Sequence, residues 1–228
     1  MRQKYLMLQK STIQFLKDLK KNNKKEWFDA NRSKYDNAKA DFEQLTLAVI
    51  KKLGKIDESI AHLEPKECLF RINRDVRFSK NKAPYKTNLA MYLSKGGKKS
   101  VYAGYYFHCE PGSAFVAGGL WMPEAANLKK LRQEIDYNWD DFKKIVEGKK
   151  LKSVFGGLEK SKETVLSRPP KGYDPENPAI EYLKFKSLIA SAKISDEDLL
   201  SKDLVKKLTN HFEILKPLID FCNQALDE

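Results

Sequence analysis

The middle of the chain contains the segment Val101-Tyr-Ala-Gly-Tyr-Tyr-Phe-His-Cys-Glu110, then Pro111-Gly112, then Ala114-Phe-Val-Ala-Gly-Gly-Leu-Trp121. Both long segments are rich in aromatic and β-branched residues, which favour extended strands. The Pro-Gly pair between them favours a tight turn. We therefore predict that the two segments pair as an antiparallel hairpin.

Two more strands are predicted before this hairpin, over residues 68–78 and 89–93. In both segments apolar side chains tend to occupy every second position, which is the period of a strand with one buried face. Gly96-Gly97 predicts a turn before the hairpin. Four strands in sequence with mostly short turns indicate an antiparallel meander within residues 66–122. Residues 187–194 are predicted to form a last strand.

Segments with a helical period lie on both sides of the predicted meander. They are residues 11–19, 24–53 and 56–63 on its N-terminal side, and 125–135, 139–146 and 203–226 on its C-terminal side. Pro217 lies inside the last of these, where we expect a kink or a break. The sequence therefore predicts one α+β domain over residues 1–228. Its antiparallel sheet of four or more strands is flanked by N-terminal helices (1–65) and a mainly helical C-terminal part (123–228).

Composition places the chain among globular proteins. Of its 228 residues, 41% are hydrophobic, and no apolar run approaches the length of a membrane span. The segment Met1–Lys10 is too polar for a signal peptide. The three widely spaced cysteines are typical of reduced, buried thiols rather than of a disulfide framework. We therefore expect a cytoplasmic protein with no membrane association.

The net charge of +12 is concentrated in the first half of the chain. Residues 1–100 carry a charge of +13, whereas residues 101–228 carry −1. Such an excess favours a polyanionic partner, either nucleic acid or a phosphorylated small molecule. The alternative is that Lys-rich helix faces serve only to keep the protein soluble.

The densest positive charge lies in a segment of sixteen residues with six cations and one carboxylate. This Arg-rich run is Arg71-Ile-Asn-Arg74-Asp75-Val-Arg77-Phe78-Ser-Lys80-Asn81-Lys82-Ala-Pro84-Tyr85-Lys86. Guanidinium groups match phosphate oxygens bidentately, and lysines add point charges. We predict an anion site, with phosphate of nucleic acid or a nucleotide as ligand. Its predicted cations are Arg71, Arg74, Arg77, Lys82 and Lys86, with Phe78 and Tyr85 available to stack on a base.

Two other interpretations of the Arg-rich run stay open. In the first, Asp75 acts as a catalytic acid or base in an enzyme for a small phosphorylated substrate. In the second, the run is a structural Arg–Asp network with no ligand. A strand over residues 68–78 would place Arg74 on the apolar side, where an unpaired guanidinium is costly. Either the chain turns near Asn73, or Arg74 meets a carboxylate such as Asp75 or Glu110.

Fixed residue types occur in this run at the spacing Arg71-x-x-Arg74-Asp75-x-Arg77-Phe78-x-x-Asn81-Lys82-x-x-Tyr85. The pattern resembles the signature of a bacterial family of conserved hypothetical proteins, the domain of unknown function 2461. Other parts of the chain also fit this resemblance: Asn22-Asn23, Trp27-Phe28, Asn31, Gly118-Gly119, Pro170-x-Gly172-Tyr173 and Pro178. The resemblance implies a single domain with the Arg-rich run at its centre. It implies no particular activity, because none is established for that family.

Three further features are candidate sites. His108 and Glu110 share one face of a predicted strand and can form a base with its orienting partner, unless His108 is simply a partly exposed histidine. Residues 166–178 are predicted to form an ordered, Pro-rich loop. This loop either covers the Arg-rich run as a lid, through Arg168, Lys171 and Tyr173, or packs Tyr173 on the core. Gly118-Gly119 either lets a ligand approach the backbone or forms a bulge.

The sequence predicts no metal site and no cofactor. It contains neither Cys-x-x-Cys nor His-Glu-x-x-His, and it has only three histidines. It also lacks the glycine motifs that hold dinucleotides or nucleoside triphosphates.

Overall fold

The computed structural model of the protein describes residues 7–227. The prediction that Met1–Lys10 is not a signal peptide falls largely on residues 1–6, which lie outside the described residues. Among the residues described, no helix is both long and apolar enough to cross a membrane.

Helices occupy both ends of the chain, as predicted. The N-terminal ones are α1 (Lys10–Lys21), α2 (Lys25–Ala30), α3 (Arg32–Leu53), the 3₁₀ helix η1 (Glu58–Ile60) and α4 (Pro65–Cys68). Those after the third strand are α5 (Ala125–Tyr137), α6 (Trp139–Val146), α7 (Lys149–Phe155), α8 (Ile180–Leu183), α9 (Asp196–Leu199) and α10 (Leu204–Asp227).

Residues 7–227 contain one four-stranded antiparallel sheet in the order β1-β2-β3-β4. Its strands are β1 (Leu89–Ser94), β2 (Gly104–Cys109), β3 (Phe115–Leu120) and β4 (Leu188–Lys193). The predicted hairpin is confirmed, with His108 opposite Phe115 and Gly104 opposite Gly119. The predicted last strand is also confirmed, since β4 pairs with β3. These strands and helices confirm the α+β class.

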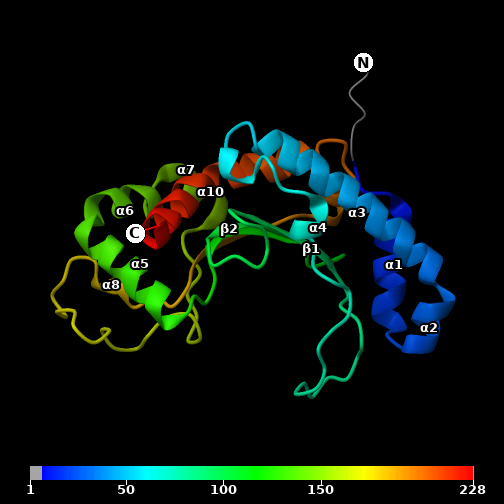
Figure 1. The fold of residues 1–228 in the computed structure, drawn as a ribbon, viewed down its shortest axis with the longest axis horizontal. Coiled ribbons are helices and arrows are strands. Elements are labelled where there is room, and N and C mark those ends of the chain that lie inside the picture. The colour runs from blue at the N-terminus through cyan, green and yellow to red at the C-terminus, as the bar shows by residue number, and fades with distance from the viewer. Residues whose placement is uncertain (1–6, 228) are drawn as a thin grey trace.

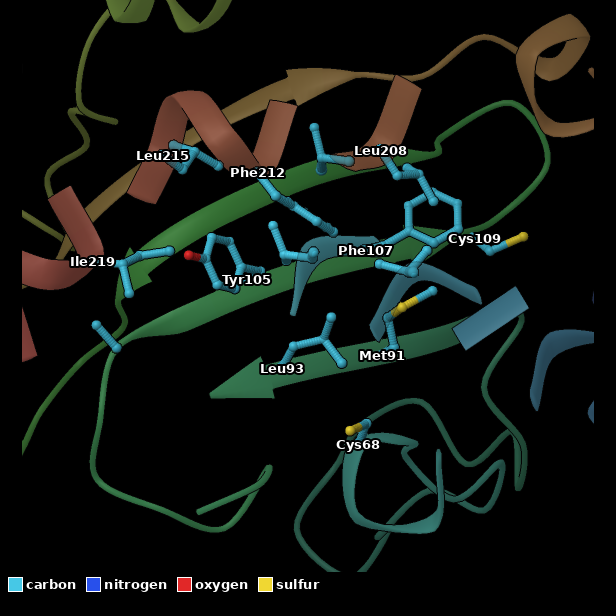
Figure 2. Packing of buried hydrophobic residues seen from close by; sticks show 14 of the residues in the cluster. Cys68, Met91, Leu93, Tyr105, Phe107, Cys109, Leu208, Phe212, Leu215 and Ile219 are labelled. Carbon is cyan, nitrogen blue, oxygen red and sulfur yellow. The ribbon is translucent and has the colours of Figure 1, made fainter. Parts of the chain in front are cut away.

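One face of the sheet is covered by α10 over β2 and β3 and by α3 over β1 (Figure 1). Alternate strand residues face these helices. Figure 2 shows Tyr105 directed toward Phe212 of α10, with 5.3 Å between the ring centroids, and the Phe107 ring stacks on Phe42 of α3 at 6.1 Å. All four of these side chains are at most 1% exposed. Apolar residues four apart along α10 make its buried stripe, so the hydrophobic effect holds the helix on the sheet.

The opposite face of the sheet, called the open face below, is not covered by α3 or α10. The cross-strand register places four side chains in adjacent positions on it: Tyr92, Tyr106, His108 and Phe115. The alternation that builds the core on one face therefore also puts aromatic rings on the other.

Two predicted elements are wrong. The strand predicted over residues 68–78 does not form: Cys68 ends α4, and isolated bridges pair only Leu69 with Met91 and Asn73 with Tyr85. The predicted helix over residues 24–53 is interrupted at Asn31, whose side chain donates to the carbonyl oxygen of Trp27 at 2.9 Å. A local side-chain hydrogen bond of this kind competes with the helical pattern.

Three smaller predictions concern Pro217, the cysteines and the glycine pair. The helix α10 runs through Pro217 without a break. Cys68, Cys109 and Cys222 are buried and unpaired, as predicted. The register of β3 is uninterrupted through Gly118 and Gly119, so no bulge occurs there.

Candidate ligand-binding site

The Arg-rich run lies in a long loop between α4 and β1, residues 69–88, which we call the arm. Figure 1 shows the arm extending away from the sheet on the side opposite α3 and α10. Two backbone hydrogen bonds pair its two sides. The amide of Arg74 donates to the carbonyl oxygen of Pro84 at 2.9 Å, and the amide of Lys86 donates to the carbonyl oxygen of Ile72 at 2.8 Å. The arm is therefore an irregular hairpin rather than a strand of the sheet.

The base of the arm is fixed to the N-terminal helices through Tyr85. The side-chain oxygen of Asn23 accepts from the Tyr85 amide at 3.0 Å, and the Asn23 side-chain nitrogen donates to the Tyr85 carbonyl at 2.9 Å. The Tyr85 ring is 6% exposed and stacks on Phe28 with 4.0 Å between centroids. Tyr85 therefore anchors the arm, and its ring is not accessible for stacking on a base.

Inside the arm, Arg74 and Lys82 bind backbone carbonyl groups. Arg74 donates to the carbonyl oxygen of Ala83 at 2.9 Å and to the hydroxyl of Ser79 at 3.4 Å. Lys82 donates to the carbonyl oxygen of Val76 at 3.0 Å. The predicted turn thus accommodates Arg74, and its partner is not a carboxylate.

At the tip of the arm, Arg77 and Asp75 form a bidentate ion pair, with a shortest distance of 2.7 Å. The hydrogen bonds from Arg77 lower the pKa of Asp75, and the charge of Arg71 lowers it further. Phe78 is 96% exposed, and the Arg77 guanidinium lies 5.9 Å from its ring centroid. The tip therefore presents an uncovered aromatic ring beside cations.

Near the base of the arm, Arg71 and Lys86 form a pair of cations. Burial lowers the pKa of Lys86, and the nearby charge of Arg71 lowers it further. The Lys86 ammonium lies 5.3 Å from the centroid of the Phe70 ring. Within residues 7–227, neither Arg71 nor Lys86 forms an ion pair with a carboxylate. Two unpaired cations at close range are the arrangement expected of an anion site.

The arginines of the run thus have different environments. Arg74 is bound inside the arm, Arg77 is paired with Asp75 at the tip, and Arg71 near the base forms no ion pair within residues 7–227. The structure does not bring the three guanidinium groups together into a single fork. The predicted cations are instead distributed along the arm.

The open face contains a pocket of about 630 Å³ next to the base of the arm. Its lining includes the aromatic residues Phe70, Tyr92, Tyr102, Tyr106, Phe115 and Trp121. A second pocket of about 570 Å³ shares Phe70 and Lys98 with the first, and it also contains Arg71, Lys66 and Lys99. An aromatic pocket therefore adjoins a basic one.

His108 belongs to a chain of polar contacts at the edge of the open face. The Tyr106 hydroxyl lies 2.9 Å from Nδ1 of His108, and Nε2 of His108 lies 3.4 Å from Oε2 of Glu110. Lys20 at 3.0 Å and Thr87 at 2.8 Å both donate to Oε1 of Glu110.

The surroundings of His108 and Glu110 lower both pKa values, which favours a neutral His108 and an ionised Glu110. Burial raises the pKa of Glu110, but the hydrogen bonds from Lys20, Thr87 and His108 outweigh it and leave that pKa below its ordinary value. Burial lowers the pKa of His108, although Glu110 opposes this effect. At neutral pH, a neutral His108 therefore accepts from Tyr106 and donates to an ionised Glu110. The predicted His–Glu pairing is present.

The Pro-rich loop lies at the other end of the molecule from the arm (Figure 1). Tyr173 packs against the hydrophobic core, whereas Arg168 and Lys171 are exposed. No residue of this loop lines either pocket. Of the two interpretations of the loop, the structure therefore shows core packing and does not support a lid over the Arg-rich run.

Sequence reasoning did not select the aromatic residues of the open face. Their signal was present in the alternation of β2, since the residues between Tyr105 and Cys109 that do not face the core include Tyr106 and His108. In the part of the chain that the structure describes, no group of three or more His, Cys, Asp or Glu side chains could hold a metal ion.

Comparison with known proteins adds one finding. A model of the family described as conserved hypothetical protein (DUF2461) matches residues 11–221. The chain belongs to this family. The resemblance inferred from the Arg-rich run is thereby confirmed. No curated protein and no solved structure matches the chain.

Proposed function

We propose that this protein binds nucleic acid in single-stranded form, with the arm holding phosphates and exposed rings stacking on bases. The observation that carries the proposal is the unpaired cation pair Arg71 and Lys86 beside the aromatic pocket. Cations without carboxylate partners retain their charge for a ligand, and aromatic side chains stack on bases of any sequence.

The tip of the arm supports the same proposal. Phe78 has no cover within residues 7–227 and is flanked by Arg77 and Lys80, so it can stack on a base while its neighbours bind the adjacent phosphates. The internal hydrogen bonds of the arm reduce the conformational entropy lost on binding. A lipid surface would fit the charge as well, but one phenylalanine supplies little apolar area for a stable membrane anchor.

The proposal is tested by fluorescence anisotropy with short labelled RNA, single-stranded DNA and duplex DNA at several salt concentrations. We expect the single strands to bind more tightly than the duplex. The variant Arg71→Ala/Lys86→Ala should bind a single strand about tenfold or more weakly. Its log–log salt slope should be shallower by about 1.4, because two phosphate contacts are lost.

The matched control is Lys51→Ala/Lys52→Ala, which removes the same charge from the exposed end of α3 on the helix-covered side. This control should bind nearly as the wild type does. Equal losses in the two double variants would indicate only a response to net charge. The absence of binding to any nucleic acid at low salt would exclude the proposal.

An enzyme acting on a small phosphorylated substrate is the second candidate function. It is favoured by the contact chain from Tyr106 through His108 to Glu110, because Tyr106 lines the aromatic pocket. A neutral histidine oriented by a carboxylate is suited to general base catalysis. In this case His108→Gln would abolish turnover while leaving substrate binding intact, and binding would depend only weakly on salt.

We also propose the cytoplasm as the location of the protein. The buried, unpaired state of Cys68, Cys109 and Cys222 supports a reducing compartment.

A further inference from the structure

The pocket on the open face has two neighbouring glycines in its floor. Gly104 and Gly119 lie opposite each other in β2 and β3. The backbone at Gly119 has a φ of +123°, and a Cβ atom there would lie 1.9 Å from the carbonyl oxygen of Leu188. A Cβ atom at Gly104 would lie 2.4 Å from the carbonyl oxygen of Leu93. Larger residues are therefore excluded at both positions. The Tyr92 ring lies over Gly104, 3.0 Å from where that Cβ atom would be, so the bare part of the floor is at Gly119.

The walls of this pocket are aromatic rings held in fixed positions. The Tyr92 hydroxyl donates to the carbonyl oxygen of Tyr102 at 2.9 Å, and the Tyr106 hydroxyl is bound to His108. The Tyr106 ring packs against Phe115 at 5.6 Å and meets Phe70 edge-on at 6.2 Å. A bare floor between fixed rings suits a flat, ring-shaped group.

Cations lie beyond one wall of the pocket. Phe70 lines this pocket and also the second one, which contains Arg71, and the Lys86 ammonium lies 5.3 Å from the Phe70 ring centroid, so an anionic group fits on that side. Asn127 and Glu124 line the pocket as well. The side-chain amide of Asn127 has no hydrogen-bond partner among the described residues, and an amide offers both a donor and an acceptor. Amides of this kind pair with the edges of nucleobases.

We infer that this pocket is a nucleobase subsite, which takes one base of the bound strand over Gly119, beside the Tyr92 ring, and directs its phosphate toward Lys86 and Arg71. The inference rests on the proposed function and deepens it. The pocket volume of about 630 Å³ lies within the range of small-ligand sites. The subsite holds a single nucleotide, so it should bind a nucleoside monophosphate in the absence of a longer strand.

The test uses adenosine and uridine monophosphates, with ribose 5-phosphate as the probe that lacks a base. Binding is followed by calorimetry and by tryptophan fluorescence; of the three tryptophans, Trp121 lines the pocket and is 60% exposed. We expect both nucleotides to bind and to quench this fluorescence, whereas ribose 5-phosphate binds at least about tenfold more weakly. Equal binding of ribose 5-phosphate and the nucleotides would overturn the inference.

The decisive variant is Ala117→Leu, which fills the pocket from the open face of β3, next to Tyr106. Its matched control is Ala125→Leu, the same change at an exposed position of α5 that does not line the pocket. We expect Ala117→Leu to weaken nucleotide binding at least about tenfold and Ala125→Leu to leave it unchanged. Thermal unfolding of both variants checks that they fold. Wild-type nucleotide affinity in Ala117→Leu would overturn the subsite.

The two proposals fail in different ways. In the first case, the wild type binds a single strand and the variant Arg71→Ala/Lys86→Ala does not. The variant Ala117→Leu, however, binds both the strand and the nucleotides as the wild type does. The subsite is then excluded and the proposed function stands. If the wild type binds neither strand nor nucleotide, both are excluded.

Discussion

The two faces of the sheet carry similar side chains in different environments. On the covered face, Tyr105 and Phe107 are at most 1% exposed beneath α10 and α3. On the open face, Tyr106 and Phe115 are only partly buried and line a pocket. Because side chains alternate along a strand, consecutive residues of β2 serve different purposes. The covering helix, rather than the residue type, decides which aromatic rings build the core and which are available to a ligand.

The largest expected effect tests this difference between the faces directly. Replacing Phe107 by Ala should lower the free energy of unfolding by about 3–5 kcal/mol, because it leaves a cavity beneath the covering helices, next to Phe42 of α3. Replacing Phe115 by Ala should cost only about 1 kcal/mol, the loss of its contacts with Tyr106 and His108. Urea unfolding of the two variants measures both values. Equal costs would mean that the open face is part of the core.

The next effect concerns the attachment of the arm to the open side of the molecule. Asn23→Ala removes both hydrogen bonds to the backbone of Tyr85. We expect a loss of about 2–3 kcal/mol, because a buried amide and carbonyl are left unpaired. Hydrogen exchange at the Tyr85 amide should also become faster.

The control for Asn23→Ala is Asn22→Ala, since Asn22 is bound only to its own helix through the carbonyl oxygen of Asp18. Its effect on both measurements should be small. If Asn23→Ala destabilised the protein no more than Asn22→Ala, the arm would be held by the stacking of Tyr85 on Phe28 instead.

A smaller effect separates the interior of the arm from its tip. Arg74→Ala should cost about 1–2 kcal/mol, because a charged donor to Ala83 is lost at a partly exposed site. Arg77→Ala should leave stability nearly unchanged, since its ion pair with Asp75 is exposed. The loss of nucleic-acid affinity, measured at one temperature for both variants, should instead be larger in Arg77→Ala than in Arg74→Ala. A larger stability loss in Arg77→Ala would instead favour a structural network at the tip.

The fold was predictable where a period continues through a whole element. Alternation located β1, aromatic and β-branched segments around Pro111-Gly112 located β2 and β3, and the helical period located α10. The same method failed over residues 69–78, where apolar residues also alternate. There Ile72 is buried near the base while Phe78 is exposed at the tip, and backbone partners come from Asn23 and from the other side of the arm. Such distant polar contacts leave no periodic signal in a sequence.

The location of the candidate site was predictable from the sequence, but the contacts of its individual residues were not. Charge density pointed to the arm, yet spacing alone did not show that Arg74 binds Ala83 or that Tyr85 stacks on Phe28. Each of these contacts depends on a turn whose geometry arises only in the folded chain. The open-face rings were missed for a related reason, because an aromatic residue on a strand has the same sequence pattern whether or not a helix covers it.

The smallest expected effect is the titration of His108, which tests how far the open face excludes water. Burial lowers its pKa below the ordinary value of 6.5, and Glu110 opposes the shift. The unfolded chain therefore binds the proton more readily than the folded one. The stability contributed by neutral His108 is complete above pH 6.5 and is lost as the pH falls through the folded-state pKa.

NMR titration of the imidazole measures that pKa. Glu110→Gln should lower it further, and Phe115→Ala, which uncovers the ring, should raise it toward 6.5. A wild-type pKa at or above 6.5 would show that water reaches His108 freely and that the two faces differ even more than the structure indicates.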